Sequence, residues 1–387
     1  MMQKRLISLL LITAAVLGIG LYLSRGQQAH EGGVSGKLIE GLDQQLNDVT
    51  AIRITGAGGA VIAELAKAGD RWTVAAKDGY TADVAKIREF LIKLGNAQLR
   101  EEKTSKKENY ARLGVEDLSA ADAKGMGVEL LGLKSPVKLI VGIAGPSGDS
   151  TLVRREGEEK SFLVSGSIIP DKEPSNWLAK SIVDVASDRV RRASITDPEG
   201  KVLNIEKTDP SAFNFAVLDV PKGRQLSSES AGNQIGGALS SVNLEDVAKA
   251  DAQKPEGDKF WRTSFATHDG LIVDVELWDV ADKTWSRWNA RVDEAQLDAW
   301  VASEKAKADA AAAAPAAAPP AEGEKPEDKP ADKPAFDAAK ARSDKLAEIQ
   351  KQVSDLNTLA SGWSFQLPSW KAANFKKTME DLLQPKS

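Results

Sequence analysis

Cysteine is absent from the 387-residue chain, and histidine occurs only twice, as His30 and His268. Without cysteine the protein forms no disulfide, no thiolate metal site and no cysteine nucleophile, and it has no site for the lipid of a lipoprotein. His268 precedes Asp269 in a His-Asp-Gly turn and could act as a base, but no nucleophile or second ligand stands near either histidine at a recognisable spacing. The sequence therefore predicts no metal, no cofactor and no catalytic residue.

A basic excess is missing as well. The chain has 51 Lys and Arg against 56 Asp and Glu, which gives a net charge of −5. Nucleic-acid binding needs a basic surface, so the composition argues against nucleic acid as a partner. We expect protein, small-molecule or glycan partners for the region beyond the N-terminal segment.

Motifs that superficially match catalytic patterns are better explained as turns. The segment Gly145–Gly148 departs from the nucleophile elbow at Asp149, where that motif needs glycine. Ser135 and Lys138 have Ser-x-x-Lys spacing, but a proline and a predicted strand keep them off a helix. Gly56–Gly59 lacks the Lys-Ser/Thr of a phosphate loop. A hydrolase assembled from distant carboxylates stays open, because acidic residues are too numerous to exclude it.

One long hydrophobic run covers residues 6–23 near the N-terminus. As a helix it would extend about 27 Å, close to the thickness of a bilayer core. Lys4 and Arg5 precede it and favour a cytoplasmic N-terminus. We interpret residues 1–25 as an uncleaved single-pass anchor in the inner membrane, with the bulk of the chain in the periplasm. The alternative is a signal peptide cleaved near residues 24–26.

The exported region is long enough for two domains. Residues 26–47 are polar and glycine-rich and are predicted to form a stalk. Residues 48–187 combine several short alternating strands with an amphipathic helix over 81–95 and a second helix near 175–185. The short connections favour antiparallel pairing, so this region is predicted to be a first α+β unit.

The same order recurs in residues 188–303, the predicted second α+β unit. A shift of 141 residues without a gap superposes pairs of matching apolar or glycine residues. We therefore expect an α+β fold of two tandem related units, produced by duplication, behind an N-terminal transmembrane helix. The aligned pairs are Ile54 with Ile195, Gly59 with Gly200, Val61 with Val202, Trp72 with Phe213, and Val74 with Phe215.

Residues 304–340 are rich in Ala, Pro, Lys, Glu and Asp and have almost no large apolar residue. Such a composition cannot bury enough surface to fold, so it predicts a disordered linker inserted into the chain. Apolar periodicity returns behind it, and residues 341–387 are predicted to form a helical segment that packs on the second unit.

Tryptophan is unusually frequent, with nine residues against three tyrosines. Most lie in the second unit or its tail, where they would form either part of the core or an exposed binding surface. Trp285 and Trp288 must point to opposite faces of a strand, which would allow one of them to be exposed, but burial in the core is the favoured interpretation of the tryptophans. The candidate interaction surface comprises Trp261, Trp278, Trp285, Trp288, Trp363 and Trp370.

Five segments together resemble domain of unknown function 4340, a family without an assigned activity. They are DVTAIRIT at 48–55, DRWTV at 70–74, GYTAD at 79–83, YARLGVED at 110–117 and NWLAKSIVDV at 176–185. The resemblance implies an envelope protein associated with components of gliding-motility-type ABC transporters. The inserted linker departs from the family pattern.

Composition, anchor and resemblance together suggest a non-enzymatic periplasmic protein. We expect an accessory or scaffold component of an ABC-type transporter or another inner-membrane complex, with a membrane protein as partner. A periplasmic module that binds glycan or peptidoglycan is the alternative, and a hydrolase is a third hypothesis.

Overall fold

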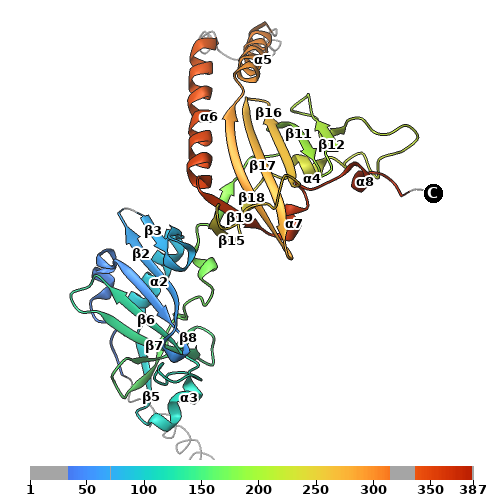
Figure 1. Ribbon diagram of the computed structural model, residues 1–387. Helices are drawn as coiled ribbons and strands as arrows, with labels where there is room; N and C mark the ends of the chain where they lie inside the picture. Colours follow the sequence, from blue (N-terminus) through green and yellow to red (C-terminus); the bar gives the residue numbers. More distant parts are fainter. Residues whose placement is uncertain (1–33, 70, 314–335, 386–387) are drawn as a thin grey trace, which may run out of the picture. The chain divides into compact units, whose positions relative to one another are not determined.

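The computed structural model describes residues 34–69, 71–313 and 336–385, and Figure 1 shows its elements. The chain divides into two compact units, with the boundary between Ala179 and Lys180. Each unit is built on one large antiparallel sheet with a few helices, which confirms the predicted α+β class. This boundary lies eight residues before the one predicted from the sequence, between 187 and 188.

The predicted anchor over residues 6–23 and most of the predicted 304–340 linker lie outside the described residues. Among the residues that are described, no helix is long and apolar enough to cross a membrane.

Unit 1 contains a nine-stranded sheet whose strands run in the order β4-β3-β2-β1-β6-β7-β8-β9-β5. Its apolar residues alternate along the strands, as at Ile52 and Ile54, which are fully buried. The strands are β1 (Ala51–Thr55), β2 (Val61–Ala68), β3 (Arg71–Val74), β4 (Tyr80–Thr81), β5 (Leu99–Thr104), β6 (Met126–Leu131), β7 (Val137–Ala144), β8 (Ser150–Arg155) and β9 (Ser161–Ser165).

The principal helix of unit 1 is α2 (Val84–Asn96), which confirms the predicted amphipathic helix. The side chain of Asp83 accepts a hydrogen bond from the backbone N–H of Lys86 at 3.0 Å and so caps the N-terminus. The helix buries one apolar stripe that includes Phe90 and Leu94. The short helix α3 (Tyr110–Leu113) contributes Tyr110 to a separate apolar cluster with Val115, Ile140 and Leu152.

The helix expected near 175–185 is wrong. Pro174–Trp177 forms a single 3₁₀ turn, and β10 (Ser181–Val183) follows it. Tertiary contacts decide the conformation here: the carbonyl of Trp177 accepts a hydrogen bond from the backbone N–H of Asp83 at 2.7 Å, and the indole packs edge-on against Phe90. These contacts hold the segment against the start of α2 and stop a helix from continuing.

Unit 2 contains an eight-stranded sheet in the order β13-β12-β11-β16-β17-β18-β19-β15. A separate pair is formed by β10 and β14 (Val242–Asn243), and α4 (Asn233–Gly236) follows β13. The strands of the large sheet are β11 (Val190–Thr196), β12 (Val202–Glu206), β13 (Ala216–Val217), β15 (Asp246–Lys249), β16 (Trp261–Thr267), β17 (Leu271–Val280), β18 (Lys283–Val292) and β19 (Trp363–Leu367).

The two sheets share one strand order. If β11 is matched with β1 and each later strand with the strand ten numbers lower, the sheet of unit 2 repeats the order of unit 1 from β3 to β5. The residues aligned by sequence follow this match: Val61 and Val202 begin β2 and β12 and are 57% and 54% exposed. Trp72 and Phe213 do not follow it, because Trp72 is buried in β3 whereas Phe213 is 87% exposed.

The two units differ by a helical insertion in unit 2. Only residues 156–160 connect β8 with β9, whereas β18 and β19 are separated by α5 (Glu294–Ala313) and α6 (Ala338–Ala360), and Figure 1 shows α6 alongside the sheet. Both helices therefore extend into the segment predicted as linker, and residues 314–335 between them lie outside the described part. Short helices α7 (Ser369–Ala372) and α8 (Met379–Leu382) complete the tail behind β19.

Candidate functional site

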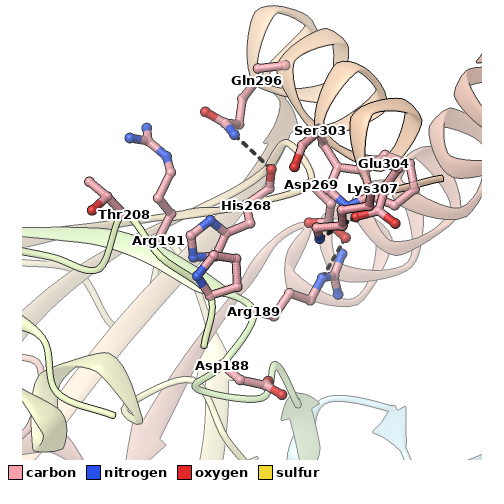
Figure 2. Close-up of a pocket in the computed structure, with 13 residues that line it drawn as sticks. Asp188, Arg189, Arg191, Thr208, His268, Asp269, Gln296, Ser303, Glu304 and Lys307 are labelled. Atoms are coloured by element: carbon pink, nitrogen blue, oxygen red, sulfur yellow. Dashed lines mark hydrogen bonds and ion pairs between the residues drawn. The ribbon is translucent and has the colours of Figure 1, made fainter. Parts of the chain in front are cut away.

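A pocket of about 550 Å³ in unit 2 brings together residues from four separate segments (Figure 2). Its walls come from the start of β11, the chain behind β12, the turn between β16 and β17, and the first half of α5. The lining residues are Asp188, Arg189, Arg191, Thr208, Pro210, His268, Asp269, Gln296, Ala299, Trp300, Ser303, Glu304 and Lys307.

The turn His268-Asp269-Gly270 connects β16 to β17 and forms the centre of the pocket. Gly270 has a φ of 100°, and a Cβ there would lie 2.7 Å from the carbonyl oxygen of Asp293, so the tight approach of α5 requires glycine. The backbone N–H of Asp293 donates to the Gly270 carbonyl at 2.7 Å. The Gln296 side chain donates to the carbonyl of His268 at 2.7 Å, as Figure 2 shows. The inserted helix therefore fixes the turn.

Asp269 is buried, and its two carboxylate oxygens have different partners. Oδ1 accepts a hydrogen bond from the Thr267 hydroxyl at 2.6 Å, and Oδ2 pairs with Nε of Arg189 at 2.8 Å. Arg189 also donates to the side chain of Gln352 on α6 at 2.8 Å. The Asp269 carboxylate is thus engaged by these groups, and the described structure contains no hydrogen bond between it and the His268 ring, so the pair lacks the arrangement of an oriented general base.

His268 lies in a positive environment. Burial lowers the pKa of the imidazole, the cations Lys207 and Arg191 lower it further, and Asp269 and Asp209 oppose them. The ring is therefore neutral near pH 7, where a histidine is an available hydrogen-bonding group rather than a fixed charge.

Two nitrogen atoms at this pocket are buried without a hydrogen-bond partner among the described residues. They are Nε of Arg191 and Nε2 of His268. The other end of the Arg191 guanidinium pairs with Glu206 at 3.2 Å. Lys207 is buried beside them: its ammonium group donates to the Ser187 carbonyl at 3.3 Å and lies 4.7 Å from the centre of the Phe215 ring. Unsatisfied buried donors cost free energy, and a ligand acceptor would relieve that cost.

The six tryptophans of the candidate surface differ widely in exposure. Trp278 and Trp285 face each other across β17 and β18 and are buried with Phe260. Trp288 is buried on the opposite face, where its ring packs edge-on at 5.6 Å from that of Phe375. Both faces of β18 are covered, which confirms the core interpretation for Trp285 and Trp288 and excludes the alternative that one of them is exposed.

The remaining three tryptophans reach the surface to different extents. Trp261 and Trp363 are half-buried, and the Lys249 ammonium group lies 3.7 Å from the centre of a Trp363 ring. Trp370 on α7 is 69% exposed. Of the six, only Trp370 presents most of its side chain to solvent.

The turn motifs have structural partners. Ser147 bonds to the Asp149 carboxylate within its own turn. Lys138 lies on β7 and contacts Glu129 at 3.4 Å and Glu156 at 3.8 Å, in a ladder of alternating charges across the sheet. Within the described residues, no group of three or more side chains of the types that ligate metals is close enough to hold an ion.

The sequence places His268 and Asp269 in one turn but does not connect that turn with the other residues of the pocket. Sequence reasoning missed Arg189, Arg191 and Gln296, because the strand pairing that joins residue 189 to residue 268 and the packing of α5 are long-range. The only local signals were a histidine next to an acid and the arginine pair directly before the Ala193–Thr196 segment.

Comparison with known families gives one match. Residues 72–259 match the family model described as Domain of unknown function (DUF4340). The matched range begins in β3 of unit 1 and ends immediately before β16 of unit 2, so it includes parts of both units. No curated protein and no solved structure matches the chain.

Proposed function

Since the chain contains a DUF4340 domain, we propose that it is a membrane-anchored, non-enzymatic scaffold of the cell envelope that docks on an inner-membrane complex. The partner would be an ABC-type transporter or a similar assembly. The anchor over residues 6–23 holds the protein at the membrane, and unit 2 supplies the contact.

The observation that carries this proposal is that a residue of the family motifs, Trp177, is buried and packs in the core of unit 1. Trp177 is 1% exposed, and its indole nitrogen donates to the Asp171 carbonyl at 3.2 Å. Lys86 pairs with the Asp171 carboxylate at 2.8 Å and lies 5.0 Å from the centre of the Trp177 ring. Motif residues committed to such contacts support a shared fold rather than shared chemistry.

A duplicated scaffold is the second part of the proposal. The common strand order supports descent of the two units from one ancestor, and so do equivalent positions such as Gly59 and Gly200, which both have positive φ angles. Duplication followed by insertion of α5 and α6 leaves unit 1 with the compact form and gives unit 2 additional surface.

Orientation and placement follow from the sequence. An apolar segment at residues 6–23 preceded by Lys4 and Arg5 favours a single span with the following units in the periplasm. A tethered module reaches a membrane partner at a high effective concentration, so even a weak contact of unit 2 would be occupied.

Affinity purification from detergent-solubilised membranes tests this function. The full chain should recover an inner-membrane protein complex, and a form in which residues 6–23 are replaced by a cleavable signal sequence should recover less of it. If neither form enriches a membrane complex above background, the scaffold proposal is wrong.

A further inference from the structure

The pocket of unit 2 exists because the inserted helix closes it. The residues from Gln296 to Lys307 that form one wall all belong to α5, and unit 1 has only residues 156–160 at the corresponding connection. The pocket volume of about 550 Å³ lies within the usual range for small-molecule sites, roughly 300 to 1,000 Å³. Unit 2 therefore has a pocket wall, formed by α5, that the short β8–β9 connection of unit 1 does not provide.

The charges around this pocket leave one cation without a carboxylate partner. Arg189 pairs with Asp269, Arg191 with Glu206, and Lys307 with Glu304. Lys207 is buried, and the only hydrogen bond of its ammonium group in the described structure is to the Ser187 carbonyl. Asp188 and Asp209 also lie nearby, but both are exposed to water.

One unpaired buried cation matches a ligand with a single negative charge. A carboxylate carries one charge and two acceptor oxygens, whereas a phosphate monoester carries close to two charges near neutral pH. Nε of Arg191 is a donor in every state, and Nε2 of neutral His268 donates in one of its two tautomers. A carboxylate has an acceptor oxygen for each nitrogen, and because both nitrogens are buried, binding requires a side-chain movement that exposes them.

The pocket also has apolar lining residues. They include Trp300 and Ala299 on α5 and Pro210 behind β12, and the ammonium group of Lys345 lies 5.2 Å from the centre of the Trp300 ring. A flat or aromatic group gains contact area against a tryptophan side chain at low entropic cost. Together, the two nitrogens and the apolar lining residues fit a molecule with one carboxylate and one apolar body.

We infer that this pocket binds a small monocarboxylate with a flat apolar body, whose carboxylate is held by Arg191 and His268 and whose body packs against Trp300. The site extends the scaffold role by giving unit 2 a ligand. It does not depend on the identity of the membrane partner.

Histidine-selective NMR of the full chain tests the inference, because the chain has only two histidines. The protein is labelled with ¹³C at the histidine Cε1 position and titrated with hippurate, which has a carboxylate and a phenyl ring. We expect a saturable shift of the His268 signal and a rise in its pKa, since a bound anion stabilises the imidazolium. His30 provides the internal reference. The neutral amide of hippurate should bind at least about tenfold more weakly, because it lacks the charge.

Matched variants locate the site. Arg191→Gln and the charge-conserving Arg191→Lys both remove the Nε–H donor and should weaken hippurate binding by roughly ten- to a hundredfold. Arg192→Gln makes the same charge change one residue away, where the side chain is exposed and bonds to Asn204 at 3.2 Å, and should leave binding unchanged. The Arg191→Lys variant keeps the test valid if Arg191→Gln does not fold.

Two further ligands, an acetylated dipeptide and inorganic phosphate, are compared with hippurate. Tighter binding of an acetylated dipeptide with a free carboxyl end than of hippurate would assign the carboxylate to a polypeptide end and support the site. The inference is overturned if hippurate at millimolar concentration leaves the His268 signal unshifted, if inorganic phosphate binds more tightly than hippurate, or if Arg192→Gln weakens binding as much as Arg191→Gln.

Discussion

Arg154 illustrates how a buried charge can serve the fold of unit 1. It is 3% exposed, and its guanidinium donates to the carbonyls of Val115 at 2.8 Å and Glu158 at 3.0 Å. It also pairs with Asp117 and lies 4.6 Å from the centre of the Tyr110 ring. Arg154 thus contacts several residues of the segment 110–117, which is one of the motifs that carry the family resemblance.

Replacement of Arg154 should loosen that segment. Arg154→Ala removes two hydrogen bonds to backbone carbonyls and one ion pair, so we expect a loss of about 2 to 3 kcal/mol in the free energy of unfolding of unit 1. Hydrogen exchange of residues 110–117 reports the change locally. Arg112→Ala removes an exposed arginine from the same segment and should cost less than about 0.5 kcal/mol. Equal protection in both variants would show that Arg154 does not organise the motif.

His268 should make the stability of unit 2 depend on pH. Its pKa is lowered by burial and by Lys207 and Arg191, against Asp269 and Asp209, whereas an unfolded histidine titrates near about 6.5. As the pH falls through about 6.5, the unfolded chain takes up a proton that the folded chain does not, so stability decreases. The decrease stops once the pH is below the folded pKa.

The pH effect can be isolated by substitution. His268→Gln should reduce the loss of stability between about pH 7 and pH 5. Chemical denaturation at each pH measures the free energy of unfolding. His30→Gln changes the other histidine of the chain and should keep the wild-type pH dependence. A wild-type profile for His268→Gln, or a steeper one, would contradict the assigned environment of the ring.

Among the elements, β18 has a side chain from α6 as its hydrogen-bonding partner where its neighbouring strand ends. β19 pairs with β18 only at Thr284, Trp285 and Ser286, so the following part of β18 needs another partner. Asn357 of α6 supplies it: its amide donates to the carbonyl of Ala290 at 2.9 Å and accepts from the backbone N–H of Ala290 at 2.7 Å. The inserted helix thereby covers an edge that would otherwise be exposed to pairing with other chains.

Removal of this amide should expose the strand edge. Asn357→Ala leaves both backbone groups of Ala290 without their partner, and we expect a loss of about 1 to 3 kcal/mol in local stability. The exchange rate of the Ala290 amide proton measures it directly. The neighbouring exposed residue gives the control, since Thr358→Ala should leave that rate unchanged. If the rate is the same in Asn357→Ala, α6 does not protect β18 through this contact.

The elements that the sequence predicts well are those with a local cause. The α2 helix has an Asp83 cap and a 3.6-residue apolar period within one segment, so its position follows from local sequence. The 3₁₀ turn at Trp177 depends on contacts with Asp83 and Phe90, which lie about a hundred residues away in the chain, and the local pattern therefore misled. The pocket residues Arg189 and Asp269 meet for the same long-range reason.

For the whole molecule, the sequence indicated the repeat but not how the second sheet is completed. Equivalent positions such as Ile54 and Ile195 come from a single sequence offset, whereas the pairing of β19 between β18 and β15 joins segments on either side of a long insertion. No short-range pattern contains that pairing. Among the described residues, the inserted helical pair and the one mostly exposed tryptophan, Trp370, both belong to unit 2.

The most direct test of this account is photo-crosslinking in living cells. A photoreactive residue is placed at Trp370, which is 69% exposed in unit 2, and at Ile92 as a control, which is 42% exposed in unit 1. The account predicts an adduct with an inner-membrane protein from position 370 and none above background from position 92. Equal adducts from both positions, or none with a membrane protein from position 370, would contradict it.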